Sequence, residues 1–335
     1  MKHYAGLDLS MDSTQVCIID ENGGKVTSVK VESAPDKIAC ALDRVGDIER
    51  AVIESGRMSP AICHGLRALG VPVVCIDARQ THQSLKALKA NKTDPHDAAG
   101  LAQLARTGFY KEVHVKSAAA HGVRSVIATR SHLVEARVRL DNMIRGICAT
   151  FGFKPGPGQG KGFIDRVMTA ADVPGLGQSI TALVAARAGL VEQIRRLDRV
   201  LREFAHQSSA CRQLMSIPGV GVQTSAAFAA AIDQADRFRQ SRTAGAYFGL
   251  VPRRHQSGEI DWTGRITKQG DSMVRKLLYE AANSILTRSR GSFALKTWAQ
   301  QIAKRRGLRK ARVALARRLA VIMHAMLRDG TLFEA

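Results

Sequence analysis

The spacing of apolar residues changes near residue 112, and this change limits what the chain can fold into. Before that point, short apolar runs of strand length alternate with turn signals and helical stretches. Two early strands joined by a turn, followed by alternating helices and strands, are typical of an α/β domain with a mixed sheet. The predicted strands are 3–9, 14–19, 25–31, 50–53 and 71–76, and the predicted helices are 35–45, 60–69, 78–88 and 95–106.

Beyond that point, residues 119–150 and 179–206 carry apolar side chains at spacings of three and four, which predicts two long helices. The segment 153–160, rich in Pro and Gly, reads as the loop between them. Two long helices around a loop suggest an antiparallel coiled-coil hairpin. A plain helical bundle that links two domains is the alternative.

The remainder, from about Cys211, predicts a compact and mainly helical unit that ends in a basic helix over 304–327. We therefore expect three parts. These are a catalytic α/β domain at 1–112, a coiled-coil or helical linker at 113–208, and a C-terminal domain at 209–335.

Charge narrows the choice of partner. The chain has 50 Lys and Arg against 29 Asp and Glu, a net charge of +21. Residues 1–110 carry equal numbers of both signs, so the whole excess lies in 111–335. A surface of this kind attracts a polyanion, and scarce aromatic anchors favour nucleic acid over an anionic membrane.

The sequence also predicts the compartment. Its apolar runs are far shorter than the roughly 20 residues of a membrane span, and residues 1–6 show no apolar signal core. The six cysteines include no C-x-x-C pair, which favours reduced thiols over a disulfide framework or zinc site. We expect a cytoplasmic, nucleoid-associated protein with no membrane partner.

Four carboxylates form the first candidate site. Asp8 lies in the first strand, Glu54 follows a later strand, and Asp94 and Asp97 share the first turn of a helix. Strand-end carboxylates and a helix-start pair can converge on one sheet edge, as a pair of Mg²⁺ ions requires. The alternative is structural: Asp94 would cap the helix ahead of Pro95, and Glu54 would be a solvated strand end.

A glycine-rich turn forms the second candidate. Gly219 and Gly221 lie in Ile217-Pro218-Gly219-Val220-Gly221, between two helical segments. Such glycines let a backbone turn present N–H groups to a DNA phosphate, as in a helix-hairpin-helix element. A glycine-rich turn inside a bundle is the alternative.

A serine beside a glycine forms the third candidate. If the segment is extended, His255 and Ser257 face the same side, and His255 could take the proton of a Ser257 nucleophile. Arg253, Arg254, His255 and Lys268 are the basic side chains nearby that we expect to contact nucleic acid. A Ser-Gly pair that forms an ordinary turn is the alternative.

These motifs, in this order, resemble the DEDD transposases of the insertion-sequence 110/1111 group, relatives of the Piv-type DNA invertases. The resemblance covers nearly the whole chain. The Lys-Thr-Asp-x-x-Asp-Ala and Gly-Leu-x-Pro…Ser-Gly blocks are specific to the group, whereas Pro-Gly-Val-Gly is shared with many DNA-binding proteins. The blocks are Tyr4–Asp8, Ile53–Ser55, Lys92–Ala98, Ser216–Gly221, and Gly249–Pro252 with Gln256–Gly258.

The resemblance implies a RuvC-like (RNase H-like) first domain, a coiled-coil middle and a C-terminal transposase domain. It assigns Asp8, Glu54, Asp94 and Asp97 to Mg²⁺, with two ions expected and Mn²⁺ as a substitute, and Ser257 to strand cleavage. It further implies recombination of insertion-sequence DNA, guided by a structured RNA encoded beside the gene. Coiled-coil pairing leads us to expect a homodimer or homotetramer.

Two other functions stay open at this point. A RuvC-like, structure-selective endonuclease would hydrolyse DNA with its metal ions and would not need Ser257. A non-catalytic nucleic-acid-binding protein would need neither the carboxylates nor Mg²⁺.

Overall fold

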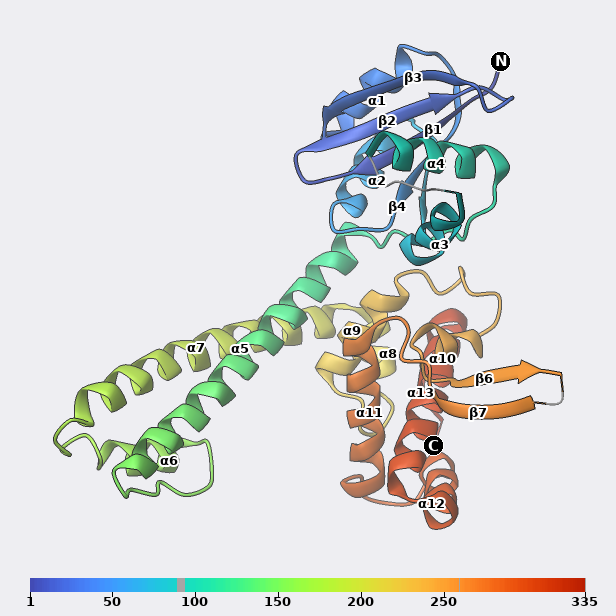
Figure 1. Cartoon of the computed structure of the whole chain (residues 1–335). Coiled ribbons are helices and arrows are strands. Elements are labelled where there is room, and N and C mark those ends of the chain that lie inside the picture. Colours follow the sequence, from blue (N-terminus) through green and yellow to red (C-terminus); the bar gives the residue numbers. More distant parts are fainter. Residues whose placement is uncertain (89–93, 259, 335) are drawn as a thin grey trace. The chain divides into compact units, whose positions relative to one another are not determined.

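The computed structural model describes residues 1–88, 94–258 and 260–334, without the side chains of 84–88, 94 and 260. The chain forms two compact units, Met1–Lys116 and Ser117–Ala335 (Figure 1). The division into three parts at 112 and 208 stays a prediction. No helix in the described ranges combines the length and the apolar character that crossing a membrane requires.

A mixed sheet forms the centre of the first unit. Its strand order is β3-β2-β1-β4-β5, with β2 antiparallel to both β1 and β3, and β4 parallel to both β1 and β5. The predicted mixed sheet is therefore confirmed. The strands are β1 (His3–Leu9), β2 (Ser13–Ile19), β3 (Lys25–Glu32), β4 (Ile48–Glu54) and β5 (Val73–Ile76).

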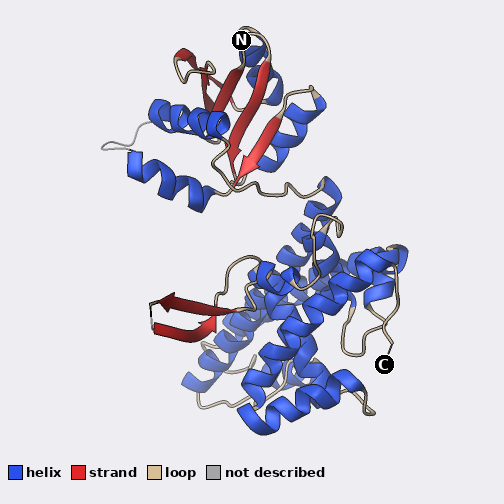
Figure 2. Ribbon diagram, turned by 90° about the vertical axis from the view of Figure 1, so that its right-hand side faces the viewer, coloured by secondary structure: helices blue, strands red, loops and turns tan. Residues whose placement is uncertain are grey.

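Helices cover both faces of this sheet (Figure 2). On one face, α1 (Pro35–Asp43) and α2 (Ser59–Ala68) pack on inward side chains such as Leu7 and Ile53. On the other, α4 (Asp94–Thr107) packs on Val52 and Cys17, and α3 (Ala78–Leu88) precedes it in the chain. Alternation along β1 and β4 therefore sends odd-numbered residues to α1 and α2 and even-numbered residues to α4.

Two long helices open the second unit. Arg130 of α5 (Ala118–Thr150) binds Asp198 of α7 (Gly177–Gln207), and Asp141 of α5 binds Arg187 of α7. Residue numbers rise along one helix as they fall along the other, so the two helices are antiparallel. The short helix α6 (Lys161–Met168), which the sequence did not predict, buries Phe163 between their ends. Coiled-coil packing stays a prediction.

A helical core with one hairpin completes the second unit. The core includes Phe228, Phe248, Leu278 and Leu319. The antiparallel hairpin of β6 and β7 is the one pair of strands in the described part of this unit. The elements are α8 (Ser209–Leu214), α9 (Val222–Ile232), α10 (Thr243–Tyr247), β6 (Pro252–Ser257), β7 (Ile260–Ile266), α11 (Ser272–Thr287), α12 (Ala294–Arg306) and α13 (Leu308–Asp329).

The prediction of a single basic helix over 304–327 is wrong. Gly307 separates α12 from α13, with a φ of +82° that side chains other than hydrogen rarely allow. The basic residues on both sides are good helix formers, so their pattern runs through the break without a sign of it.

Candidate functional site

Asp8 and Glu54 lie at the carboxyl ends of two adjacent parallel strands. Leu7 of β1 is in register with Ile53 of β4, and each carboxylate is the next residue along its strand. Both are even-numbered, so both side chains lie on the sheet face that α4 covers. Both residues are half-buried. The structure thus brings two of the predicted site residues to one edge and one face of the sheet.

Helix α4 crosses β1 at Gly6. A Cβ added to Gly6 would lie 2.1 Å from the carbonyl oxygen of Ala98 and 2.3 Å from the nitrogen of Ala102. Farther along, Arg50 at the start of β4 donates a hydrogen bond to the carbonyl oxygen of Ala105 (3.1 Å). The helix therefore runs antiparallel to β1 and β4, and its first turn reaches the strand ends that carry the carboxylates.

That first turn contains the other two predicted residues. Asp97 is half-buried and immediately precedes Ala98, which touches Gly6. Asp94 begins α4, and its side chain lies outside the described residues. Across the side chains that are described, no group of three or more His, Cys, Asp or Glu residues is arranged to hold a metal ion.

Two thiols, Cys63 and Cys75, lie on the opposite face of the sheet. Cys75 of β5 is in register with Ile53 and packs, like it, toward α1 and α2. A hydrogen bond from the Cys63 thiol lowers the pKa of Cys75, and the same bond together with burial raises the pKa of Cys63. All six cysteines are free thiols, as the sequence predicted. Cys63 and Cys75 thus lie away from the carboxylate face, whereas Cys17 lies on it, packed against α4.

Ser257 occupies the exposed end of the hairpin. It is the last residue of β6 and is in register with Ile260 of β7. Because the segment is extended, His255 and Ser257 share a face of the hairpin, as expected if the segment were a strand. The His255 ring stacks on that of Trp262, with centroids 5.9 Å apart. An exposed hydroxyl such as that of Ser257 can reach a DNA phosphate. Another serine of this unit, Ser225, is fully buried and cannot.

The predicted arginines of the hairpin differ in their partners. Arg254 donates two hydrogen bonds to Asp261, of 2.9 and 2.6 Å, and this contact lowers the pKa of the Asp261 carboxyl. Arg253 donates a long hydrogen bond, of 3.5 Å, to the carbonyl oxygen of Thr267. A phosphate that binds Arg254 must therefore compete with the Asp261 carboxylate for its hydrogen bonds. Among the described residues, Arg253 has no such acidic competitor.

The glycine-rich turn connects α8 to α9. Gly219 has a φ of +87°, and a Cβ there would lie 2.9 Å from Cγ1 of Ile285 in α11. The lack of a side chain at Gly219 thus lets α11 pack closely against the turn. Gly221 is the N-cap residue of α9, is exposed, and has open space where a Cβ would be. Of the two, Gly221 has the geometry to admit a phosphate, and helix-hairpin-helix function stays a prediction.

Comparison with known proteins supplies the family. Residues 5–151 match the model of the DEDD transposases of IS110 elements, and residues 211–299 match that of the transposase IS116/IS110/IS902 family. A probable family 20 transposase of Pseudomonas aeruginosa is 31% identical over 74% of this chain and 75% of its own length. The transposase of element IS1111A from Coxiella burnetii is 28% identical over 96% and 88%.

A solved structure gives a much weaker match. RuvC of T. thermophilus in complex with a Holliday junction covers 34% of this chain at 15% identity, with a TM-score of 0.27. That score is too low to support a conclusion about this chain. The two family models and the relatives, by contrast, agree along most of its length, so the chain belongs to the IS110/IS1111 family of DEDD transposases.

Proposed function

We propose that this transposase cuts and rejoins the DNA strands of an insertion sequence through a covalent bond between DNA and Ser257, in a Mg²⁺-dependent reaction. One observation carries the proposal: the first turn of α4 lies over the ends of β1 and β4 that bear Asp8 and Glu54. Family membership supports DNA transposition itself. The identity of the nucleophile, the metal and the guide RNA are parts of the proposal.

Asp8, Glu54, Asp94 and Asp97 would hold the metal ions. Their donors are carboxylate oxygens, which Mg²⁺ prefers, and Mn²⁺ accepts the same ligands. The two strands are rigid neighbours in a sheet, and close packing at Gly6 fixes the helix that bears the other pair. When bound, the ions would polarise the scissile phosphate and stabilise the departing sugar oxygen.

Ser257 would attack the scissile phosphorus. A bond forms between its Oγ and phosphorus, and the bond from phosphorus to the leaving sugar oxygen breaks. His255, on the same face of the hairpin, takes the serine proton, and solvent water gives a proton to the leaving sugar oxygen. Because one phosphodiester replaces another, the bond energy is kept for rejoining the strand.

The proposed site draws on both compact units, since the carboxylates lie in Met1–Lys116 and Ser257 in Ser117–Ala335. A productive complex must therefore assemble on DNA, within one chain or between the chains of a homodimer or homotetramer. The second unit carries the excess positive charge and would follow the DNA backbone. A structured guide RNA, which the resemblance implies, would bind the same basic surface.

A hydrolytic nuclease is the second candidate. All four carboxylates lie in one unit, and hydrolysis of a phosphodiester would need no group from the other. In that case water would attack the phosphorus, and Ser257 would be dispensable.

A trapping experiment separates these functions. The protein is mixed with Mg²⁺, RNA from the flanking non-coding region and DNA that carries the element junction, and the products are run on a denaturing protein gel. Ser257→Ala and Asp8→Asn are compared with two matched controls, Thr263→Ala on the neighbouring strand and Asp12→Asn in the turn after β1. Both control residues are exposed.

We expect a DNA-linked protein band that both site variants lose and both controls keep. Free nicked DNA that survives Ser257→Ala, without a linked band, would establish hydrolysis instead. If the wild-type protein binds the DNA but neither nicks it nor becomes linked to it, the protein is non-catalytic.

A further inference from the structure

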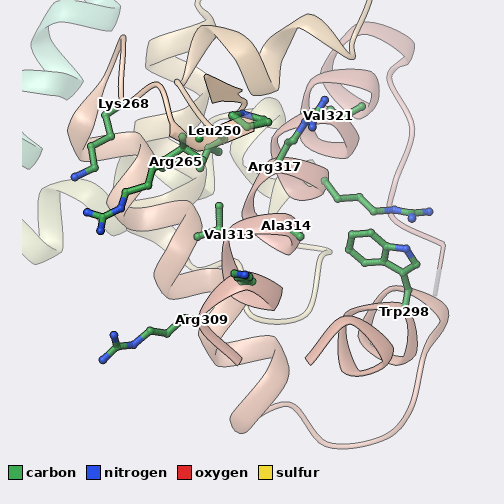
Figure 3. Close-up of a pocket in the computed structure, with 14 residues that line it drawn as sticks. Leu250, Arg265, Lys268, Trp298, Arg309, Val313, Ala314, Arg317 and Val321 are labelled. Atoms are coloured by element: carbon green, nitrogen blue, oxygen red, sulfur yellow. The ribbon is translucent and has the colours of Figure 1, made fainter. Parts of the chain in front are cut away.

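A cavity of about 870 Å³ lies in the second unit, between the base of the β6–β7 hairpin and helices α12 and α13 (Figure 3). Neither the family match nor the proposed cleavage chemistry assigns it a role. Its volume is in the range of pockets that hold drug-sized ligands, roughly 300–1,000 Å³. The hairpin contributes Pro252 and Ile266, and α13 contributes a face that runs from Arg309 to Val321.

The walls are apolar and the rim is cationic. Side chains such as Leu250, Val313 and Ala314 supply the apolar surface. Among the described residues that line the cavity, none is acidic. The six cations are Arg265, Lys268, Arg309, Lys310, Arg317 and Arg318.

These cations are available to a ligand. In the described ranges, none of the six forms an ion pair with an acidic side chain. All six are exposed. In Figure 3 the charged ends of Arg265, Lys268 and Arg309 point away to one side of the cavity, and Trp298 lies on the other. A ligand that fits must therefore combine a flat apolar part with negative charge.

An aromatic ring offers the flat part a partner. Trp298 of α12 is half-buried at the cavity, and the Arg318 guanidinium lies 4.6 Å from the centre of its ring. Nucleobases stack on such rings and on arginine planes, in a manner that tolerates any base.

The wall on the hairpin side is tightly built. Gly249 has a φ of +64°, and a Cβ there would lie 2.3 Å from the carbonyl oxygen of Gln269. The amide of Lys268 donates a hydrogen bond to the Gly249 carbonyl oxygen (3.1 Å), and Lys268 itself adopts a left-handed backbone, with a φ of +57°. Thus the Gly-Leu-Val-Pro motif positions a lysine at the rim and Leu250 inside the cavity.

We propose that this cavity binds an unpaired nucleotide of the DNA strand being recombined, with its base against Trp298 and the apolar wall and its phosphates on the cationic rim. The proposal rests on the proposed function for the presence of DNA. It adds a site where the transposase holds a base out of the stack, a state that duplex DNA reaches only at the cost of unstacking.

Charge and shape favour this occupant over others. Paired bases are hidden in the stack, so a duplex can contact the rim but not the apolar wall. An apolar peptide would leave the cations of the rim without a negative partner. A single strand satisfies both surfaces, and DNA is the substrate that the family membership supports.

The hairpin relates this cavity to the proposed cleavage residue. Pro252 lines the cavity and Ser257 ends the same strand, five residues on. At about 3.3 Å per residue the two are roughly 17 Å apart along the strand, a distance that a single strand of DNA spans with a few nucleotides. The extruded nucleotide should therefore lie a few positions from the cut phosphate.

The chain's two tryptophans make the test direct, because they are Trp262 and Trp298. Trp262→Phe leaves Trp298 as the sole tryptophan, whose emission is excited selectively above the tyrosine absorption, and Trp298→Phe leaves Trp262 on the hairpin. Both changes are combined with Ser257→Ala, so that no cleavage occurs. Each protein is titrated with a thymidine oligonucleotide, with an abasic strand of equal length and charge, with the corresponding duplex, and with the uridine RNA strand.

We expect the thymidine strand to quench Trp298 strongly and the abasic strand and duplex to do so weakly. Val313→Glu, which adds an acid to the apolar wall, should weaken binding of the thymidine strand by roughly tenfold, the scale of one base stack. Arg306→Ala, an exposed cation of α12 outside the cavity, should change it far less. Circular dichroism confirms that each variant is folded.

Three results would overturn the proposal. Equal quenching by the abasic strand would mean that the site reads phosphates alone. Tighter binding of the RNA strand would assign the cavity to RNA. A Trp298 signal that changes with protein concentration before any nucleic acid is added would assign it to a second copy of the chain.

This test and the trapping experiment fail separately. If Trp298 is quenched but no DNA-linked protein forms, the proposal for the cavity is supported and the proposal of a serine nucleophile is refuted. If the linked protein forms and Trp298 does not respond, the reverse holds.

Discussion

Gly6 of β1 and Ala98 of α4 are in direct contact, so closely that a Cβ on Gly6 would lie 2.1 Å from the Ala98 carbonyl oxygen. The contact sets the depth of α4 on the sheet. It also fixes the distance from the first turn of α4 to Asp8, two residues beyond Gly6 on the same face. A residue with no side chain therefore controls the geometry of the proposed carboxylate site.

Gly6→Ala should disturb the proposed carboxylate site although Gly6 is not one of its residues. The added methyl must push α4 away from backbone atoms that cannot yield, and overpacking of this kind costs about 1–3 kcal/mol. Urea unfolding should show that loss, and strand cleavage should fall further than the loss of folded protein explains. Gly122→Ala in α5, where a Cβ meets nothing within 4 Å, is the matched control and should be neutral or stabilising. An unchanged unfolding midpoint for Gly6→Ala would refute the packing argument.

Magnesium should stabilise the protein through the same carboxylates. A ligand at about 100 times its dissociation constant stabilises the folded state by roughly 2.7 kcal/mol. We expect Mg²⁺ to raise the melting temperature of wild type and of Asp12→Asn, and to have little effect on Asp8→Asn or Asp97→Asn. If Mg²⁺ raises the melting temperature of Asp8→Asn as much as that of wild type, Asp8 is not a Mg²⁺ ligand.

The antiparallel helix pair depends on a buried ion pair. Arg187 donates to Asp141 at 2.6 Å, and their side chains are 8% and 1% exposed. Asp141→Asn leaves the guanidinium buried without its counter-charge, which costs about 3–5 kcal/mol. Glu192→Gln, in the exposed pair with Arg196, should cost less than about 0.5 kcal/mol. If both substitutions lower the free energy of unfolding equally, burial does not determine how much an ion pair contributes to stability.

His324 should make the second unit less stable in acid. Burial lowers the pKa of this histidine, whose ring nitrogens bond Ser241 and the Ala235 carbonyl oxygen, each at 3.0 Å. Below about pH 6.5 the unfolded chain binds a proton that the folded chain refuses, so the free energy of unfolding falls as the pH falls. Both tryptophans lie in this unit and report its unfolding in urea. The stability difference between wild type and His324→Gln should shrink from pH 7.5 to pH 5, and a constant difference would contradict it.

The sequence predicts the first unit well because its signals are local. Strands β1, β4 and β5 contain short apolar runs, β2 and β3 alternate apolar with polar residues, and the turn at Asn22-Gly23 marks a hairpin. It also identifies which carboxylates to examine. That Asp8 and Glu54 share one edge of the sheet follows from the strand order, and that the first turn of α4 lies near them follows from the contact at Gly6; no local pattern contains either. The first-turn partner Asp94 is placed only in part, since its side chain lies outside the described residues.

The second unit is harder to predict because its informative features are tertiary. Strand β6 is exposed along its whole length and has no apolar alternation, so the segment does not read as a strand. Helix α6 is short and forms where Phe163 and Val167 can be buried against α5 and α7. The cavity is assembled from the hairpin, α12 and α13. Of its cations, the sequence singles out Lys268 as a nucleic-acid contact and gives those of α13 only as part of a basic helix. Trp298 gives no signal of its own.

The central claim is that Ser257 joins DNA to this protein, and peptide mapping tests it most directly. Trypsin cuts after Arg254 and Arg265 and so releases residues 255–265, in which Ser257 is the only serine. After nuclease digestion of the DNA-linked protein, mass spectrometry should find a nucleotide phosphate on Ser257 of this peptide. A nucleotide on any other residue, such as the exposed Ser272, or an unmodified 255–265 peptide throughout the linked fraction, would contradict the account.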